Sequence, residues 1–236
     1  MQLLALSSSK VNNSDYLAPY LNWIDQHLSG CRRVLFIPFA GVSVDFDAYQ
    51  ARVAAALQPL SIELDSLHRF DNPAQAVEDA EAILVGGGNT FALLKRLQQL
   101  NLLGLIRKRV TEGLPYIGWS AGANLVGVSI RTTNDMPIVQ PDSFEALGLL
   151  PFQLNPHYTD QHPADFHGET RDMRLAEFME LEPMMPIIAL PEGSALLRQG
   201  EQLTVLGEPG AYQFKAGDKG HLTAGSDLSA LLRNRP

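Results

Sequence analysis

The sequence predicts an α/β protein: a mostly parallel sheet with helices on both faces and a short antiparallel extension at the C-terminal end. In the first half of the chain, apolar runs of strand length alternate with segments of helical periodicity, which is the pattern of successive β–α–β units. Most of these runs end in glycine, asparagine or serine, as strands that lead into turns do. The strands expected from this pattern cover residues 3–8, 33–40, 61–67, 82–88 and 115–120.

Helices are expected between these strands. Ser14 and Asp15 can cap a first helix and Gly30 can close it, because short polar side chains accept from the free N–H groups at a helix start, and glycine adopts the left-handed conformation at its end. The apolar face of this helix would consist of Leu17, Leu21, Ile24 and Leu28. The further helices expected cover about 45–58, 73–80, 91–100 (with Thr90 as its cap) and 102–112.

The second half of the chain predicts fewer helices and more short strands. A strand is expected at 126–133, another ends near residue 157, and a third covers 186–193. Beyond these, Gly200 and Glu201 have the composition of a hairpin turn. Because no internal repeat, low-complexity segment or linker interrupts the chain, we expect residues 1–236 to form a single domain.

Composition excludes several classes of function. The chain has 236 residues, 45% hydrophobic and 19% charged residues, and a formal net charge of −8, which is typical of a globular protein with a substantial core. It contains no run of lysines and arginines, so nucleic acid is not an expected partner. An acidic ligand would be repelled at long range and would need a local cation.

Cysteine content and apolar segments indicate the compartment. The single cysteine, Cys31, excludes an intramolecular disulfide and a cysteine-based zinc site, and this fits a reducing environment. The N-terminal segment has no basic stretch before its apolar run, and no stretch of about 18 apolar residues occurs. We therefore expect a cytoplasmic protein without a signal peptide or a membrane span.

The segment Gly118-Trp119-Ser120-Ala121-Gly122 lies where a predicted strand runs into a helix. It matches the G-x-S-x-G pattern of a nucleophile elbow, although a tight turn alone could also explain it. In an elbow, glycines two positions before and after the serine avoid collisions in a strained turn. The N–H of Ala121 would then lie at a helix start, where it can stabilise developing negative charge.

Three consecutive glycines, residues 86–88, follow the preceding predicted strand. This loop lacks the lysine and hydroxyl residues of a P-loop and the spacing of a dinucleotide-binding loop. A close approach of backbone N–H groups to a reacting carbonyl fits it better, so Gly87 or Gly88 is expected to provide the second oxyanion donor, and Gly88 is preferred.

A serine nucleophile requires a base and a group that orients the base. Among six histidines, His157 has the most suitable position, at the end of an apolar stretch and after the rigid Pro156. Two acids lie at suitable places, Glu192 at the end of a predicted strand and Asp135 in a polar loop. The order serine, histidine, glutamate differs from that of α/β-hydrolases.

The assembled motifs resemble those of the peptidase E family, the α-aspartyl dipeptidases, through nearly the whole chain to about residue 217. The segments that carry the resemblance are LFIPFAG (35–41), VGGGNTF (85–91), YIGWSAGANL (116–125), IRTTNDMPIV (130–139), QLNPHYT (153–159), GETR (168–171) and LPEG (190–193). The resemblance implies a flavodoxin-like sheet related to class I glutamine amidotransferases, whose nucleophile, histidine and acid follow the same order. It also implies cytoplasmic hydrolysis of dipeptides with N-terminal aspartate, without a metal or cofactor.

The resemblance also implies roles for individual residues. Ser120 would be the nucleophile and His157 the general base. Glu192 and Asp135 are both carried as the third member; chain order favours Glu192 as the partner of His157, with Asp135 then pairing with the substrate's α-amino group. The side chain of the substrate aspartate would bind to Arg171, whose bidentate guanidinium suits a carboxylate, unless Arg171 only pairs with acidic neighbours on a helix surface. Asn89 could add an amide contact.

Two other functions remain open at this point. A cyanophycinase-like hydrolase would use the same chemistry on aspartyl-linked polymers or isoaspartyl peptides. A non-catalytic binding module of the same fold would be expected to lack the serine or the histidine, and both are present. The expected partners are small acidic dipeptides, not nucleic acid or a membrane, and the expected assembly is a monomer or small homo-oligomer.

Overall fold

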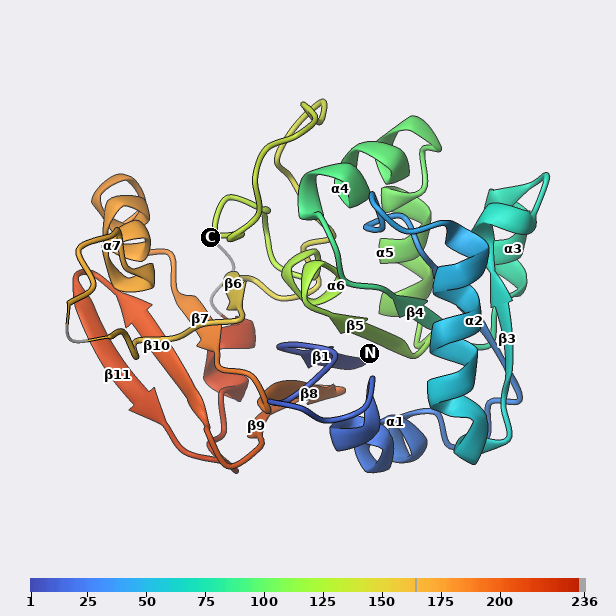
Figure 1. Ribbon diagram of the computed structural model, residues 1–236, viewed down its shortest axis with the longest axis horizontal. Coiled ribbons are helices and arrows are strands. Elements are labelled where there is room, and N and C mark those ends of the chain that lie inside the picture. The colour runs from blue at the N-terminus through green and yellow to red at the C-terminus, as the bar shows by residue number, and fades with distance from the viewer. Residues whose placement is uncertain (164, 234–236) are drawn as a thin grey trace.

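The computed structural model describes residues 1–163 and 165–233 and arranges them in two β-sheets with flanking helices (Figure 1). The larger sheet has seven strands in the order β3-β2-β4-β5-β1-β8-β9. The first five of these strands run parallel, β8 is antiparallel to β1, and β9 is antiparallel to β8. In that order the strands are β3 (Glu63–Ser66), β2 (Arg33–Ile37), β4 (Ile83–Val85), β5 (Tyr116–Trp119), β1 (Gln2–Leu6), β8 (Ala195–Gln199) and β9 (Gln202–Leu206).

Helices cover both faces of the larger sheet, because side chains of each central strand alternate between two apolar clusters. In β1, Leu3 and Ala5 belong to one cluster, and Leu4 and Leu6 to the other. One face packs against α1 and α2, and the other against α3 to α6 (Figure 1). The helices are α1 (Leu21–His27), α2 (Phe46–Leu57), α3 (Pro73–Asp79), α4 (Thr90–Gln99), α5 (Leu103–Thr111), α6 (Ala121–Asn124) and α7 (Arg171–Leu181).

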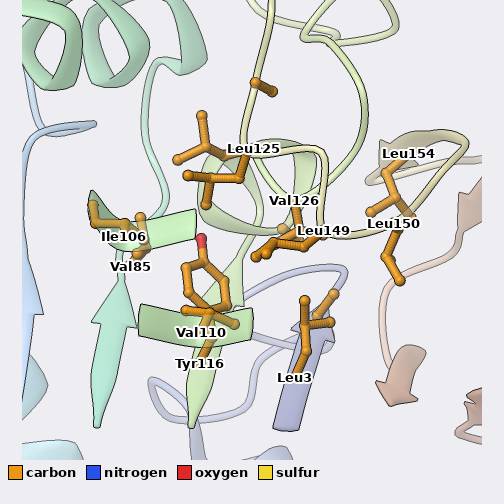
Figure 2. Close-up of a cluster of buried hydrophobic side chains, with 14 of the residues drawn as sticks. Leu3, Val85, Ile106, Val110, Tyr116, Leu125, Val126, Leu149, Leu150 and Leu154 are labelled. Atoms are coloured by element: carbon orange, nitrogen blue, oxygen red, sulfur yellow. The ribbon is translucent and has the colours of Figure 1, made fainter. Parts of the chain in front are cut away.

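The apolar core between the larger sheet and helices α3 to α6 joins distant parts of the sequence. Figure 2 shows Leu3 of β1 and Tyr116 of β5 with Ile106 and Val110 of α5, and with Leu125, which follows α6. All five side chains are fully buried. The Tyr116 hydroxyl donates to the Gly122 carbonyl at 2.7 Å, so its one polar atom in this core is satisfied.

The smaller sheet has four strands in the order β11-β10-β7-β6, with α7 packed against it. Its strands are β6 (Gln153–Pro156), β7 (Ile187–Leu190), β10 (Ala211–Lys215) and β11 (Asp218–Leu222). β6 and β7 are parallel neighbours, so the residues after Pro156 and Leu190 come together at one edge. The hydroxyl of Ser7 links the two sheets, because it donates to the Leu190 carbonyl at 2.7 Å and accepts from the His157 N–H at 3.0 Å.

The predicted fold class is confirmed, as are the C-terminal antiparallel strands and the turn at residues 200–201 between β8 and β9. The first helix begins later than predicted. Leu17 has a positive φ of 58°, a 3₁₀ turn covers Ala18–Tyr20, and α1 starts only at Leu21. Pro19 explains the delay, since a proline inside the predicted helix would lack the N–H that bonds to the carbonyl four residues earlier and its ring would clash with that carbonyl. Ser14 accepts from the Val11 N–H and caps no helix.

Two further predictions are wrong. Residues 126–133 form no strand; this apolar segment contributes a single isolated bridge, from Ser129 to Glu145, and its N–H groups bond to carbonyls of neighbouring loops. The cap of α4 is Asn89, whose Oδ1 accepts from the Ala92 N–H at 3.0 Å, whereas Thr90 is the first residue of the helix.

The close packing of α6 on the sheet predicts a large cost for adding one methyl group. A Cβ on Gly122 would lie 2.2 Å from the Val85 carbonyl oxygen, and the two residues belong to α6 and β4. We expect Gly122→Ala to lower the free energy of unfolding by at least about 1–3 kcal/mol in urea titrations. Gly104→Ala in α5 is the control, because nothing lies within 4 Å of its added Cβ and alanine is favoured in a helix by about 1 kcal/mol. Equal effects of the two substitutions would contradict this account.

Candidate active site

Ser120 lies between β5 and α6 with a strained backbone, at φ 53° and ψ −112°. Such a conformation typically costs about 1–3 kcal/mol and persists only where the surroundings enforce it. The Ser120 N–H donates to the Leu6 carbonyl at 3.1 Å, and its carbonyl accepts from Asn124 at 2.9 Å. A Cβ on Gly118 would lie 2.3 Å from the Gly122 carbonyl oxygen. The two glycines of the predicted elbow are therefore required by the close approach of strand and helix.

Two cavities adjoin Ser120. The larger has a volume of about 730 Å³ and is lined among others by Tyr16, Gly88, Arg52 and His157. The smaller, of about 20 Å³, is lined among others by Asp135 and His157. The half-buried Ser120 thus lies between two recesses that it shares with the predicted base.

His157 and Glu192 follow the neighbouring parallel strands β6 and β7. Nδ1 of His157 and Oε1 of Glu192 lie 2.8 Å apart. Because an ionised carboxylate can only accept, the proton of a neutral His157 is on Nδ1, and Nε2 retains a lone pair. This is the arrangement in which an acid orients a general base toward a nucleophile.

No hydrogen bond or ion pair joins Asp135 to His157, although both line the smaller cavity. Its Oδ2 accepts from the N–H and the hydroxyl of Thr90, at 2.7 and 2.6 Å. The carboxylate therefore holds the start of α4 and at the same time lines the smaller cavity beside Ser120. Of the two acids that the sequence left open, Glu192 is the one in contact with the histidine.

The triple-glycine loop lies directly against the serine. A Cβ on Gly87 would be 2.9 Å from the Ser120 Cβ, and a Cβ on Gly88, at φ 136°, would be 2.2 Å from the Ala40 carbonyl oxygen. Within the described residues, no hydrogen-bond acceptor contacts the N–H of Gly88 or of Ala121. Two free donors therefore occur on the two segments that meet at Ser120, as an oxyanion site requires.

The structure gives Asn89 mainly a structural role. Its amide nitrogen donates to the Met136 carbonyl at 2.8 Å, and its oxygen caps α4. Both ends of the amide are thus bonded within the protein, although the residue lines the larger cavity.

Arg171 is the first residue of α7 and is absent from the described lining of both cavities. Burial and the nearby Arg174 lower the pKa of its guanidinium, whereas Asp135 and Glu169 raise it. Glu169 pairs instead with Arg174 and Asp172 with Lys219, so among the described residues Arg171 forms no ion pair on the helix surface.

Three residues near Ser120 escaped the sequence analysis: Tyr16, Tyr49 and Arg52. Tyr49 occupies a buried position on α2 and looked like ordinary core, and Tyr16 belongs to a segment expected to be helical. Arg52 extends from α2 over the ring of Tyr16, with 6.0 Å from Cζ to the ring centroid. No motif marks these positions, because the contacts join segments far apart in the sequence.

The fold and the site together are those of an α/β serine hydrolase. The model of Peptidase family S51 matches residues 3–206 of the chain. Peptidase E of Shewanella amazonensis is 50% identical over 233 residues, which cover 98% of this chain and 99% of that protein. Peptidase E of Shewanella denitrificans is 51% identical over 230 residues, 97% of this chain and 98% of that protein. The chain therefore belongs to Peptidase family S51 and is a serine peptidase.

Solved structures support the same fold at lower identity. The crystal structure of a peptidase from an acI-B1 Actinobacterium superposes with a TM-score of 0.71 at 21% identity and covers 96% of each chain. A Peptidase E protein from Listeria monocytogenes EGD-e superposes with a TM-score of 0.65 at 22% identity, covering 87% of this chain and 98% of that one.

The different contacts of the two acids predict different effects of their amides. Glu192→Gln removes the carboxylate that fixes the His157 tautomer, so we expect kcat to fall by about 10²–10⁴-fold with little change in stability. Asp135→Asn replaces an acceptor of two hydrogen bonds at the start of α4, so we expect it to lower thermal stability as well as activity. Steady-state kinetics and thermal melts of both variants test this. The assignment is wrong if Glu192→Gln retains full turnover.

Proposed function

We propose that Ser120, His157 and Glu192 perform the chemistry of this serine peptidase, and that its substrates are dipeptides with N-terminal aspartate. The observation that carries the proposal is the 2.8 Å contact between His157 and Glu192 beside a cavity shared with the strained Ser120. Sequence identity of 50% over almost the full length with a protein named Peptidase E supports the dipeptidase assignment.

In the proposed reaction, Nε2 of His157 takes the proton of the Ser120 hydroxyl as Oγ attacks the carbonyl carbon of the aspartyl residue. The N–H groups of Gly88 and Ala121 stabilise the negative oxygen of the tetrahedral intermediate. When the C–N bond breaks, His157 returns the proton to the leaving amine. Water then attacks the acyl-enzyme and gives a proton to His157, which passes it to the Ser120 oxygen as the ester C–O bond breaks and aspartate leaves.

Two charged residues are assigned to the binding of an aspartyl substrate in this proposal. Asp135, at the smaller cavity, is the proposed partner of the substrate's α-ammonium group. Arg171 at the start of α7, a cation that forms no ion pair among the described residues, is the proposed partner of its side-chain carboxylate. A local cation is needed for such a substrate, because the chain's net charge is −8.

We also propose that the protein acts in the cytoplasm. Cys31 is a free thiol in the structure, in keeping with a reducing compartment. Within residues 1–163 and 165–233, no helix combines the length and apolarity needed to cross a membrane.

The nucleophile assignment predicts the outcome of one substitution. Ser120→Ala should abolish hydrolysis of Asp-Leu, because alanine lacks the attacking oxygen. Stability should not fall, because the substitution leaves the surrounding packing unchanged. Activity is measured by release of free leucine, and folding by circular dichroism. Near-normal turnover of Ser120→Ala would rule out the mechanism.

A substrate panel separates the dipeptidase from the cyanophycinase-like hydrolase. In the same assay, the first residue of the dipeptide is varied among Asp, Asn, Glu and β-linked Asp, and an Asp-Arg polymer is tested as a further substrate. Preference for α-linked Asp-Xaa supports the dipeptidase. Preference for the polymer or the β-linked peptide supports the cyanophycinase-like alternative.

Arg171 provides the test of substrate recognition. We expect Arg171→Met to lower kcat/KM for Asp-Leu by more than about tenfold, equivalent to about 1.4 kcal/mol of binding energy in the transition state. The control is Arg174→Met, which removes a guanidinium from the same helix that is already paired with Glu169. If both substitutions have the same small effect, Arg171 is not the aspartate anchor.

A further inference from the structure

A chain of three hydrogen bonds runs from the residue before Ser120 to the triple-glycine loop. The indole Nε1 of Trp119 donates to the Tyr16 hydroxyl at 2.9 Å. The Tyr16 hydroxyl donates to that of Tyr49 at 3.2 Å, and the Tyr49 hydroxyl donates to the Gly87 carbonyl at 2.9 Å. The chain begins on β5, passes through the segment before α1 and through α2, and ends on the loop after β4.

The direction of this chain follows from the donors at its start. An indole N–H can only donate, so the Tyr16 oxygen accepts from it and its own proton goes to Tyr49. The Tyr49 proton is then available only for the Gly87 carbonyl, which can only accept. Burial raises the pKa of both tyrosines above its ordinary value, so both hydroxyls remain protonated donors.

The tyrosine at the end of the chain is rigidly held. Tyr49 is 4% exposed, and its ring packs edge to face against Phe36 with centroids 5.0 Å apart. Phe36 in turn stacks on Trp119 at 5.9 Å, with an interplanar angle of 4°. A Cβ on Gly86 would lie 2.5 Å from the Tyr49 hydroxyl oxygen. The glycine loop therefore lies so close to the Tyr49 hydroxyl that a side chain at position 86 would collide with it.

The Gly87 carbonyl and the Gly88 N–H belong to the same planar peptide group and point in opposite directions. A hydrogen bond to the carbonyl therefore fixes the direction of the N–H. In a loop of three glycines this matters more than elsewhere, because glycine backbones rotate freely and the peptide could otherwise turn over. Successive hydrogen bonds also polarise one another, which makes the N–H a stronger donor.

We propose that the Trp119–Tyr16–Tyr49 chain, which we name the tyrosine relay, is a positioning device that holds the Gly88 N–H toward the oxyanion formed at Ser120. The relay rests on the proposed function, since it acts on the proposed oxyanion donor. Tyr49 is its decisive member, because its hydroxyl contacts the peptide group itself. The relay also connects this donor to the residue adjacent to the nucleophile, so both halves of the oxyanion site keep a fixed relative position.

The test is Tyr49→Phe, which removes one oxygen and leaves the ring to pack on Phe36. Loss of a whole oxyanion donor typically costs about 10²–10³-fold, and here the donor remains but loses its orientation. We therefore expect kcat for Asp-Leu to fall about 10–100-fold with KM within about threefold. Tyr16→Phe, which interrupts the relay one step earlier, should give a smaller loss. Tyr212→Phe is the matched control, since that tyrosine belongs to β10 of the smaller sheet.

A second measurement separates positioning from a general structural role. An aspartyl aldehyde forms a hemiacetal when Ser120 Oγ adds to its carbonyl carbon and the serine proton passes to His157, and the former carbonyl oxygen then occupies the oxyanion position. Free aspartate keeps a planar α-carboxylate and forms no tetrahedral adduct with Ser120. We expect Tyr49→Phe to weaken the aldehyde about 10–100-fold and aspartate by less than about threefold. In the free protein, the ¹⁵N–¹H signal of Gly88 should shift in Tyr49→Phe and not in Tyr212→Phe.

Three results would overturn the relay. The first is a Tyr49→Phe variant equal to the wild type in kcat and aldehyde affinity. The second is an equal loss in Tyr212→Phe, and the third is a loss confined to KM and aspartate binding. If Tyr49→Phe does not fold, the same comparisons are made with Tyr16→Phe. A wild-type protein that neither cleaves Asp-Leu nor binds the aldehyde through Ser120 would overturn the proposed function itself.

Discussion

The segment that follows β1 holds the active site together. β1 lies in the larger sheet between β5 and β8, and its last carbonyl, of Leu6, accepts from the N–H of Ser120. The next residue, Ser7, bonds to the backbone of His157. Further along, the Tyr20 hydroxyl accepts from the Gly193 N–H at 3.1 Å and so holds the turn after Glu192. One short stretch of chain therefore fixes all three proposed catalytic positions relative to one another.

This arrangement matters because the catalytic residues come from two sheets. Ser120 follows β5 of the larger sheet, whereas His157 and Glu192 follow strands of the smaller one. A hydrogen-bond network in a catalytic site needs positions accurate to a fraction of an ångström. The Ser7 hydroxyl helps to fix these positions, because it is buried and both donates and accepts a hydrogen bond where the two sheets meet.

The features that could be predicted from the sequence are those that depend on residues close together in the chain. The parallel strands follow from the alternation of apolar runs. The elbow follows from the two glycines around Ser120, and the clearance of Gly118 is set within a few residues, by the Gly122 carbonyl. For the partner of His157, strand-end position and chain order favoured Glu192, but the sequence also left Asp135 open, because both acids lie in segments of suitable composition. Only the pairing of β6 with β7 brings Glu192 to the histidine.

Other features were missed because tertiary contacts override local signals. The segment 126–133 has the composition of a strand. Its backbone groups, however, form separate hydrogen bonds to several loops, so no strand ladder forms. Tyr49 has the spacing of a core residue and is one, yet its hydroxyl makes a specific bond that no periodicity can show. The burial of a side chain can be anticipated from sequence, but the use of its polar atom depends on residues far away in the chain.

The role proposed for Arg171 would make selectivity for aspartate depend on the state of this side chain before substrate binds. Burial already lowers the pKa of its guanidinium, so part of the cost of removing water from the charge is met when the protein folds. A substrate with a carboxylate then gains a charge-assisted contact. A substrate with an apolar or amide side chain would enclose the cation without an opposite charge, and sites of this kind reject such analogues more strongly than apolar pockets reject a missing methylene. Selectivity in this mechanism therefore arises mainly from the cost of leaving Arg171 unpaired.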